Sequence, residues 1–438
     1  MIGQAAGEGE QGGRRRLAGS LASLLVLQIA GYALPLLAMP LLGRALGPEG
    51  LGTFALSVSL AQIGYLVADF GFSVSATDRI ARHLGDRELV NRLASQVLAC
   101  KLALLALLAL PTTAFAALSA EPRAVGVVLL TWLLTAALTL QPAWLLQAFG
   151  RLASFTLALF VCRAGFVLAI YAMVRDPGDL WLVLGINALS HLAAAAAGWL
   201  VVRRLDVRLV PVSPAECLTA LARSFSFMLS RAAAASYTSA ATALLAIGGA
   251  GPHAVGQYAA AEQIYRGLQG LVQPATQALL PFMSSRRDLV LFRRLFWLIL
   301  ALTLAAAIAC AMLAEPLMAL VFGSGFAESA GLLQLFMLVL VIYVPGVLLG
   351  YPFLAAFDRA ALANRSVLLA GAAQVAIVAI LFATDRLTAS TLILSILAAE
   401  LVVLATRLRW ARVLTGRQSG SDQPSVLREQ PLSLGGGA

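Results

Sequence analysis

A row of polar side chains interrupts a long apolar segment in the second half of the chain. The intervals are 4, 3, 4 and 4 residues, and the row consists of Glu262, Arg266, Gln269, Gln273 and Gln277. At about 100° per residue, all five lie within roughly 80° of one face of a helix. A charged group at the centre of a bilayer costs at least about 2.5 kcal/mol, so this face must contact protein or a water-filled cavity.

A second polar face lies 204 residues earlier. Its members Gln62, Tyr65, Asp69 and Ser73 correspond to Arg266, Gln269, Gln273 and Gln277. Two related helices with equivalent polar faces are what a cavity between two related halves would produce. The alternative is that Glu262 and Arg266, one turn apart, only neutralise each other. That pairing does not account for the glutamines that continue along the face.

Other apolar segments carry isolated polar groups. No acid lies within one turn of Arg231, so its partner is on another helix or is a ligand, and Thr238 lies on nearly the same face. A guanidinium suits an anionic phosphate because it donates two parallel hydrogen bonds. Lys101 and Arg163 are each as consistent with a contact between helices as with a cavity. We predict a substrate cavity lined by Arg231, Arg266, Glu262, Gln269, Gln273, Gln62, Asp69, Thr238, Lys101 and Arg163.

The segments that hold these residues are long enough to cross a bilayer. The chain of 438 residues is 60% hydrophobic and 12% charged, and soluble domains carry about twice that charged fraction. Continuous apolar runs of about 20 residues favour membrane helices over a barrel. We predict twelve spans, at about 17–42, 53–74, 93–117, 124–149, 154–174, 179–202, 224–248, 257–282, 289–314, 330–356, 361–383 and 387–408.

The net charge of +10 follows the predicted topology and does not indicate nucleic acid as a partner. Basic residues cluster between alternate spans, for example at Arg14–Arg16 and Arg203–Arg208, and the opposite loops hold few. By the positive-inside rule both termini are cytoplasmic. We therefore expect a multi-pass protein of a plasma membrane, with no nucleic acid bound.

The chain also contains an internal repeat. Residues 47–55, GPEGLGTFA, match residues 251–259, GPHAVGQYA, and each stretch lies between two long apolar segments. The offset gives each half six helices, and an even number of crossings keeps the halves parallel. We predict an all-α polytopic membrane protein with about twelve transmembrane helices in two six-helix bundles, related as a parallel repeat around a central cavity. Its parts are a disordered cytoplasmic tail (1–16), an N-terminal bundle (17–209), a C-terminal bundle (210–414) and a second disordered cytoplasmic tail (415–438).

Several kinds of site are missing from the sequence. There is no phosphate-binding loop of the ATPase type, and three scattered histidines with no acid cluster leave no convincing metal site. All connections between spans are short, which argues against a catalytic domain. We expect no cofactor, no metal, no catalytic residue and no enzymatic activity. Internal repeats in secondary transporters place the substrate path between the halves, so transport is the leading hypothesis.

A resemblance to a known family supports this hypothesis. The run at residues 42–52, LGRALGPEGLG, continuing to ADFGF at 68–72, resembles the N-terminal signature of bacterial polysaccharide flippases. These are Wzx-like members of the multidrug/oligosaccharidyl-lipid/polysaccharide exporter superfamily. Residues 320–326 and 354–359 are more loosely similar, and the resemblance covers about 17–410.

The resemblance implies two six-helix lobes and translocation of undecaprenyl-diphosphate-linked oligosaccharide across the bacterial inner membrane by alternating access. Such lipid-linked oligosaccharides feed O-antigen, capsule or exopolysaccharide synthesis. The expected partners are this substrate, membrane lipids, and polysaccharide polymerase and chain-length proteins. In the family, cationic cavity residues attract the diphosphate, a role that would fall here on Arg231 and Arg266, with Lys101 or Arg163 beside them. Glu262 departs from a purely cationic cavity.

Three other functions remain open. A drug/cation antiporter of the same superfamily would use an intramembrane acid; the span at 17–42 has none, but Glu262 keeps this possibility. Short loops and the lack of an acidic catalytic pair oppose a membrane glycosyltransferase or polymerase. A non-transporting scaffold for polysaccharide assembly is opposed only by the polar faces.

Overall fold

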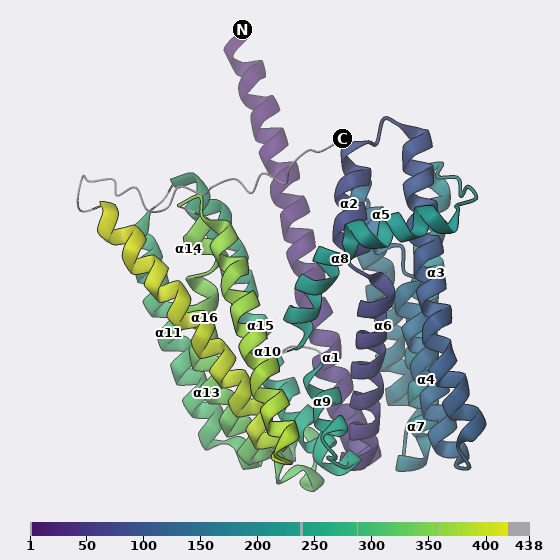
Figure 1. Cartoon of the computed structure of the whole chain (residues 1–438). Helices are drawn as coiled ribbons and strands as arrows, with labels where there is room; N and C mark the ends of the chain where they lie inside the picture. The colour runs from purple at the N-terminus through teal and green to yellow at the C-terminus, as the bar shows by residue number, and fades with distance from the viewer. Residues whose placement is uncertain (1, 237–239, 287, 356, 419–438) are drawn as a thin grey trace.

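The computed structural model describes residues 2–236, 240–286, 288–355 and 357–418, and regular structure in these residues is helical (Figure 1). The fold is therefore all-α, as predicted. The helices are α1 (Ile2–Asp69), α2 (Phe72–Arg82), α3 (Arg87–Leu118), α4 (Pro122–Thr139), α5 (Ala143–Ala148), α6 (Leu152–Met173), α7 (Leu180–Val202), α8 (Pro214–Ser236), α9 (Ala241–Ile247), α10 (Pro252–Arg286), α11 (Leu289–Met312), α12 (Ala314–Phe322), α13 (Ser329–Leu348), α14 (Tyr351–Ala355), α15 (Ala360–Ala383) and α16 (Ala389–Gln418), with short 3-10 turns η1 (Pro177–Asp179), η2 (Arg203–Leu205) and η3 (Ser324–Phe326).

Nine stretches of the described residues are long and apolar enough to cross a membrane. Three of the twelve predicted spans are not among these stretches. The first stretch begins at Leu36, so it omits most of the predicted span at 17–42, which is also in α1. The eighth predicted span is in α10, which carries the polar row. The seventh is divided between α8 and α9. A helix that lines a polar cavity does not need to be apolar on every face, so its mean hydropathy is lower than that of a helix surrounded by lipid.

Helix α1 consists of two helices that meet at Gly47. This residue has φ 70° and ψ −178°, a conformation that glycine adopts without steric cost. In Figure 1 the chain descends from the N-terminus, reverses at the bottom of the view and rises towards α2. The two segments match the first two predicted spans. Helix α1 begins at Ile2, within the tail predicted at residues 1–16.

The other end of the chain also differs from its predicted boundary. Helix α16 continues to Gln418, four residues beyond the predicted end of the C-terminal bundle. The rest of the predicted C-terminal tail, 419–438, lies outside the described residues. Prolines lie at two helix breaks: Pro142 lies between α4 and α5, and the break between α13 and α14 follows Pro345, whereas α10 continues through Pro274.

The two copies of the repeat cross each other at glycine. A Cβ added to Gly52 would overlap the carbonyl oxygen of Pro252, and a Cβ added to Gly256 would overlap the carbonyl oxygen of Pro48. Each of these residues is 204 positions from its counterpart, so the contact is symmetric between the halves. Only glycine allows α1 and α10 to approach backbone to backbone. This crossing holds the halves together at the end that carries the Gly47 and Gly251 turns.

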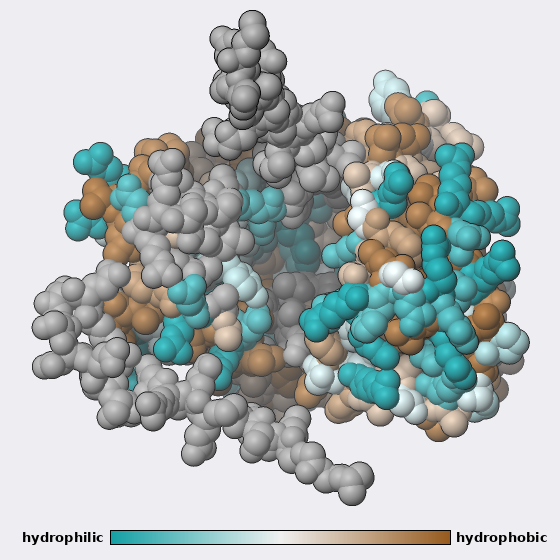
Figure 2. Space-filling view, turned by 90° about the horizontal axis from the view of Figure 1, so that it is seen from above, coloured by the Kyte–Doolittle hydropathy of each residue, from teal (hydrophilic) through white to brown (hydrophobic). Residues whose placement is uncertain are grey.

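The opposite end carries the arginine-rich connections. In Figure 1 the N-terminus, α2 and the end of α16 lie at the top of the view, with the start of α8. Figure 2, seen from that side, shows a hollow between the two halves with hydrophilic residues along it. The halves are therefore joined at the glycine crossing and separated towards the arginine-rich end.

We expect Gly52→Ala and Gly256→Ala to destabilise the protein, because the added methyl group meets backbone of the other half. Overpacking of this kind costs about 1–3 kcal/mol. Gly331→Ala is the matched control, since a Cβ there meets nothing within 4 Å. Thermal unfolding of the purified variants in detergent measures the effect. Equal midpoints for Gly256→Ala and Gly331→Ala would contradict the crossing.

Candidate functional site

A cavity of about 780 Å³ lies between the two halves. Its walls come from both segments of α1, from α4, α6 and α7 of the N-terminal half, and from α9, α10 and α13. Six of the ten predicted site residues line it: Gln62, Arg163, Glu262, Arg266, Gln269 and Gln273. The polar face of α10 thus lines this space with Glu262, Arg266, Gln269 and Gln273, whereas the related face of α1 contributes Gln62 and not Tyr65, Asp69 or Ser73.

On α10, Glu262 and Arg266 form an ion pair across one helical turn. Arg266 Nη2 lies 2.9 Å from Glu262 Oε1, and the two side chains are 44% and 13% exposed. The neighbouring Gln269 donates its amide to the hydroxyl of Tyr265 at 2.6 Å. Arg266 is therefore paired and still reachable from the cavity. The pairing considered from the sequence does occur, and it leaves the rest of the polar face in place.

Arg163 of α6 is the cation of the cavity that has only neutral partners among the described residues. Its Nη1 donates to Asn187 Oδ1 at 2.6 Å and contacts His191 Nε2 at 3.2 Å. Its guanidinium carbon lies 4.9 Å from the centroid of the Phe166 ring. On its other side, His191 Nδ1 lies 3.0 Å from the side-chain amide nitrogen of Gln141. This chain orients Arg163 without neutralising its charge.

Asn187 and His191 of α7 also line the cavity and were not among the predicted site residues. They lie four residues apart, one helical turn, in a helix that is otherwise apolar. That spacing is the signal that could have identified them. Thr242 of α9 lines the cavity as well, whereas the predicted Thr238 lies outside the described residues.

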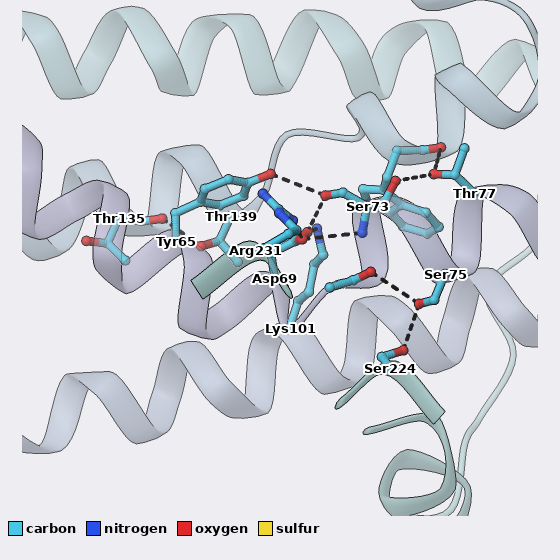
Figure 3. A network of polar contacts seen from close by, with 12 residues as sticks. Tyr65, Asp69, Ser73, Ser75, Thr77, Lys101, Thr135, Thr139, Ser224 and Arg231 are labelled. Atoms are coloured by element: carbon cyan, nitrogen blue, oxygen red, sulfur yellow. Dashed lines mark hydrogen bonds and ion pairs between the residues drawn. The ribbon is translucent and has the colours of Figure 1, made fainter. Parts of the chain in front are cut away.

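Three predicted cavity residues instead form a buried charge cluster away from the cavity (Figure 3). Asp69, at the end of α1, has no exposed surface. Lys101 Nζ lies 2.7 Å from Asp69 Oδ1, and Arg231 of α8 pairs with Oδ2. Ser73 donates its hydroxyl to Oδ1 at 2.6 Å. The partner of Arg231 is therefore on another helix, the first of the two options that the sequence left open.

Burial explains why Asp69 and Lys101 do not belong to the cavity. Their side chains are 0% and 2% exposed, and a buried charge must be paired and hydrogen-bonded. The Lys101 ammonium lies 5.5 Å from the Trp144 ring centroid and 6.0 Å from that of Tyr65. Arg231 keeps 30% of its side chain exposed. Two cations share one carboxylate, so the cluster retains an excess of positive charge.

Comparison with known protein families identifies the family of this chain. The family model described as polysaccharide biosynthesis protein matches residues 17–286. The chain belongs to this polysaccharide biosynthesis family. A relative in Escherichia coli K12, described as "Putative O-antigen transporter", is 28% identical over 266 residues, 60% of this chain and 63% of that protein. A protein of Shigella dysenteriae with the same description is 22% identical over 262 residues, 60% of this chain and 66% of that protein. The chain thus matches slightly less than two thirds of each relative's length.

Solved structures share the fold of this family member. The lipid II flippase MurJ, in an inward closed conformation, superposes with a TM-score of 0.68 at 10% identity, covering 91% of this chain and 94% of that one. A MATE structure in complex with MaL6 gives a TM-score of 0.58 at 17% identity, covering 91% and 96%. At these identities the likeness concerns the fold. It confirms an architecture shared with transporters of the MOP superfamily, to which one of the matched MATE transporters is assigned.

We expect cysteines at Gln62 and Gln273 to react with a membrane-impermeant maleimide in a background lacking the four native cysteines. Both positions line the central cavity, so water and reagent reach them. Ala61→Cys is the matched control, because Ala61 precedes Gln62 and is fully buried. The measurement is the labelled fraction in inverted and right-side-out vesicles. Protection of both cysteines under all conditions would mean that the polar faces are packed and dry.

We expect Asp69→Asn to lower stability strongly, because it leaves the Lys101 ammonium buried without a counter-charge. Breaking a buried pair costs about 3–5 kcal/mol. Asp69→Asn/Lys101→Met should recover part of the loss. Asp78→Asn is the control, since Asp78 pairs with Arg82 at the surface and such pairs contribute about 0–1 kcal/mol. Thermal unfolding that is equal for Asp69→Asn and Asp78→Asn would contradict a structural role for the cluster.

Proposed function

We propose that this protein translocates an undecaprenyl-diphosphate-linked oligosaccharide from the cytoplasmic to the periplasmic leaflet of the bacterial inner membrane. The main support for this proposal is the cavity between the halves, in which the described residues that bond to Arg163 are all neutral. Family membership and the two O-antigen transporter relatives support a role in surface polysaccharide synthesis. The shared fold with a lipid II flippase supports a substrate that is a lipid-linked sugar.

The charges of the cavity favour an anionic substrate. Its ionised lining residues are Arg163, Arg266 and Glu262, which sum to one positive charge. Moving a diphosphate across a bilayer is slow because its charges lose water. Guanidinium and amide donors from Arg163, Asn187 and Arg266 replace that water, and charge-assisted hydrogen bonds to phosphate are the stronger kind. The polyprenyl chain has no desolvation cost and stays in the lipid.

The arrangement of the halves supports alternating access. The halves meet at Gly52 and Gly256 and are hollowed apart towards the arginine-rich face. With the arginine-rich face in the cytoplasm, as the positive-inside rule requires, the cavity receives substrate from the cytoplasmic leaflet. Delivery then requires the glycine crossing to part while the arginine-rich ends close. Both termini are cytoplasmic in this arrangement, and polysaccharide polymerase and chain-length proteins would use the product on the other side.

A drug/cation antiporter is the nearest alternative, because Glu262 supplies an acid in the cavity. Its carboxylate, however, is occupied by Arg266 at 2.9 Å, and Arg163 adds a further cation. A cationic drug would meet a net positive cavity. The geometry therefore favours transport of an anion, with Glu262 holding Arg266 in position.

We expect Arg163→Gln to reduce surface polysaccharide export about 10-fold to 100-fold, the range for losing one charge-assisted hydrogen bond. Arg163→Lys should retain part of the activity, since it keeps the charge but not the two parallel donors. Arg123→Gln is the control, an exposed arginine of the same half outside the cavity. The measurement is surface polysaccharide in cells lacking the chromosomal gene, normalised to the amount of membrane protein.

Two outcomes would overturn the proposal. Full export with Arg163→Gln at normal protein level would remove the proposed anion site. The antiporter would be favoured if the deletion strain kept its surface polysaccharide and became more sensitive to cationic drugs. In that case wild type should restore drug resistance and Glu262→Gln should not.

A further inference from the structure

A second cavity lies at the arginine-rich end of the N-terminal half, between α2, α3 and α8. Its volume is about 140 Å³. Two arginines line it, Arg79 of α2 and Arg223 of α8, and most of the remaining lining is apolar, including Phe72, Val97 and Phe227. None of its lining residues is shared with the central cavity. A property of this cavity is therefore separate from the proposed transport path.

Neither arginine is neutralised by an acid in the described part of the chain. Asp78, the acid that lines the cavity, pairs with Arg82 at 3.0 Å. The acid of α8, Glu216, lies 2.7 Å from Arg92. No side-chain hydrogen bond of Arg79 or Arg223 to a described residue is present either. Burial, followed by the positive charge of Arg223, lowers the pKa of Arg79.

The two arginines are held in place by the docking of α8 on the N-terminal half. Ser75 of α2 and Ser224 of α8 are hydrogen-bonded at 2.7 Å, next to Arg223 in sequence. Met228 lies one turn after Ser224 in α8, and its backbone nitrogen would be 2.7 Å from a Cβ added to Gly71, so the two backbones are in close contact there. These contacts fix α8 against α2 and so position Arg79 and Arg223, but they supply no negative charge to either arginine. An anion between them would remove the repulsion.

The surroundings of the cavity indicate that this anion is carried by a lipid. Phe227 of the cavity lining is 41% exposed, and the same helix α8 carries further exposed apolar side chains: Leu218 at 67%, Phe225 at 53% and Leu229 at 58%. A helix with exposed apolar residues and nearby arginines is typical of the headgroup region of a membrane. In Figure 1 the first part of α8 runs across the top of the N-terminal half, at the arginine-rich end. A soluble anion would not require this apolar lining.

We infer that Arg79 and Arg223 bind the phosphate group of a membrane lipid at the arginine-rich face. Each guanidinium can donate two parallel hydrogen bonds to phosphate oxygens, and Phe227, which is 41% exposed, contacts the first carbons of the lipid chain. Two sources carry this chemistry, a glycerophospholipid of the bilayer and a polyprenyl phosphate. A lipid held here fastens α8, the first helix of the C-terminal half, to α2 of the N-terminal half.

Native mass spectrometry of the full-length protein in detergent tests this site. The probes are phosphatidylglycerol, undecaprenyl phosphate, diacylglycerol and inorganic phosphate, added to wild type, Arg79→Gln, Arg223→Gln and the double variant. We expect about tenfold weaker binding of at least one lipid phosphate in each single variant and a larger loss in the double variant. Arg82→Gln, whose arginine already pairs with Asp78, should bind as wild type does.

The probes distinguish the sources. A loss restricted to phosphatidylglycerol assigns the site to bilayer lipid, and a loss restricted to undecaprenyl phosphate assigns it to polyprenyl phosphates. Equal binding of diacylglycerol, inorganic phosphate as tight as the lipids, or no loss in the double variant would each overturn the inference. Folding is checked by thermal unfolding in lipid-free detergent, where Arg79→Gln should be at least as stable as wild type because it removes a like-charge contact. Transport plays no part in the measurement, so its outcome is independent of the proposed function.

Discussion

The backbone contact between Gly52 and Gly256 fixes the arrangement of the two halves. It brings α1 and α10 together at one end, where neither helix has a side chain to hold the other away. Two helices that touch at one end and diverge must enclose a space that widens towards the other. Gln62 of α1 and its counterpart Arg266 of α10 both line that space because they follow the glycines at matching positions of the repeat. The repeat therefore determines both the closed end and the composition of the cavity wall.

The intramembrane charges differ in how they are stabilised. This difference distinguishes charges that hold helices together from a charge that can bind substrate. Asp69 is enclosed by Lys101 and Arg231 and holds helices together. Arg407 of α16, 6% exposed, donates to the carbonyl of Gly346 at 2.7 Å and to the hydroxyl of Ser366 at 2.9 Å. Arg163 also has neutral described partners, but it faces the cavity. A cation that is hydrogen-bonded, without an acid, beside open space is the group best placed to receive an anion.

Periodicity and repetition in the sequence predicted most of this architecture. The all-α class, the reversal at the first repeat and the shared cavity of Gln62, Arg266 and Gln273 follow from spacing along single helices. Partners on distant helices do not. Arg231 and Asp69 are 162 positions apart, so no local pattern indicated that they neutralise each other. Arg163 was given no more weight than Lys101, because both are lone cations in apolar helices and only packing shows that one is enclosed and the other faces water.

The same contacts suggest where the chain divides when the halves move. Helix α8 was assigned to the C-terminal bundle by its position after the linker. Its contacts with the N-terminal half include the ion pairs of Arg231 with Asp69 and of Glu216 with Arg92, and the hydrogen bond of Ser224 with Ser75. It also packs against α15. Separating a buried ion pair leaves uncompensated charge, whereas apolar side chains can slide over one another. When the halves rock, we therefore expect α8 to stay with the N-terminal half and the boundary of motion to fall between α8 and α9.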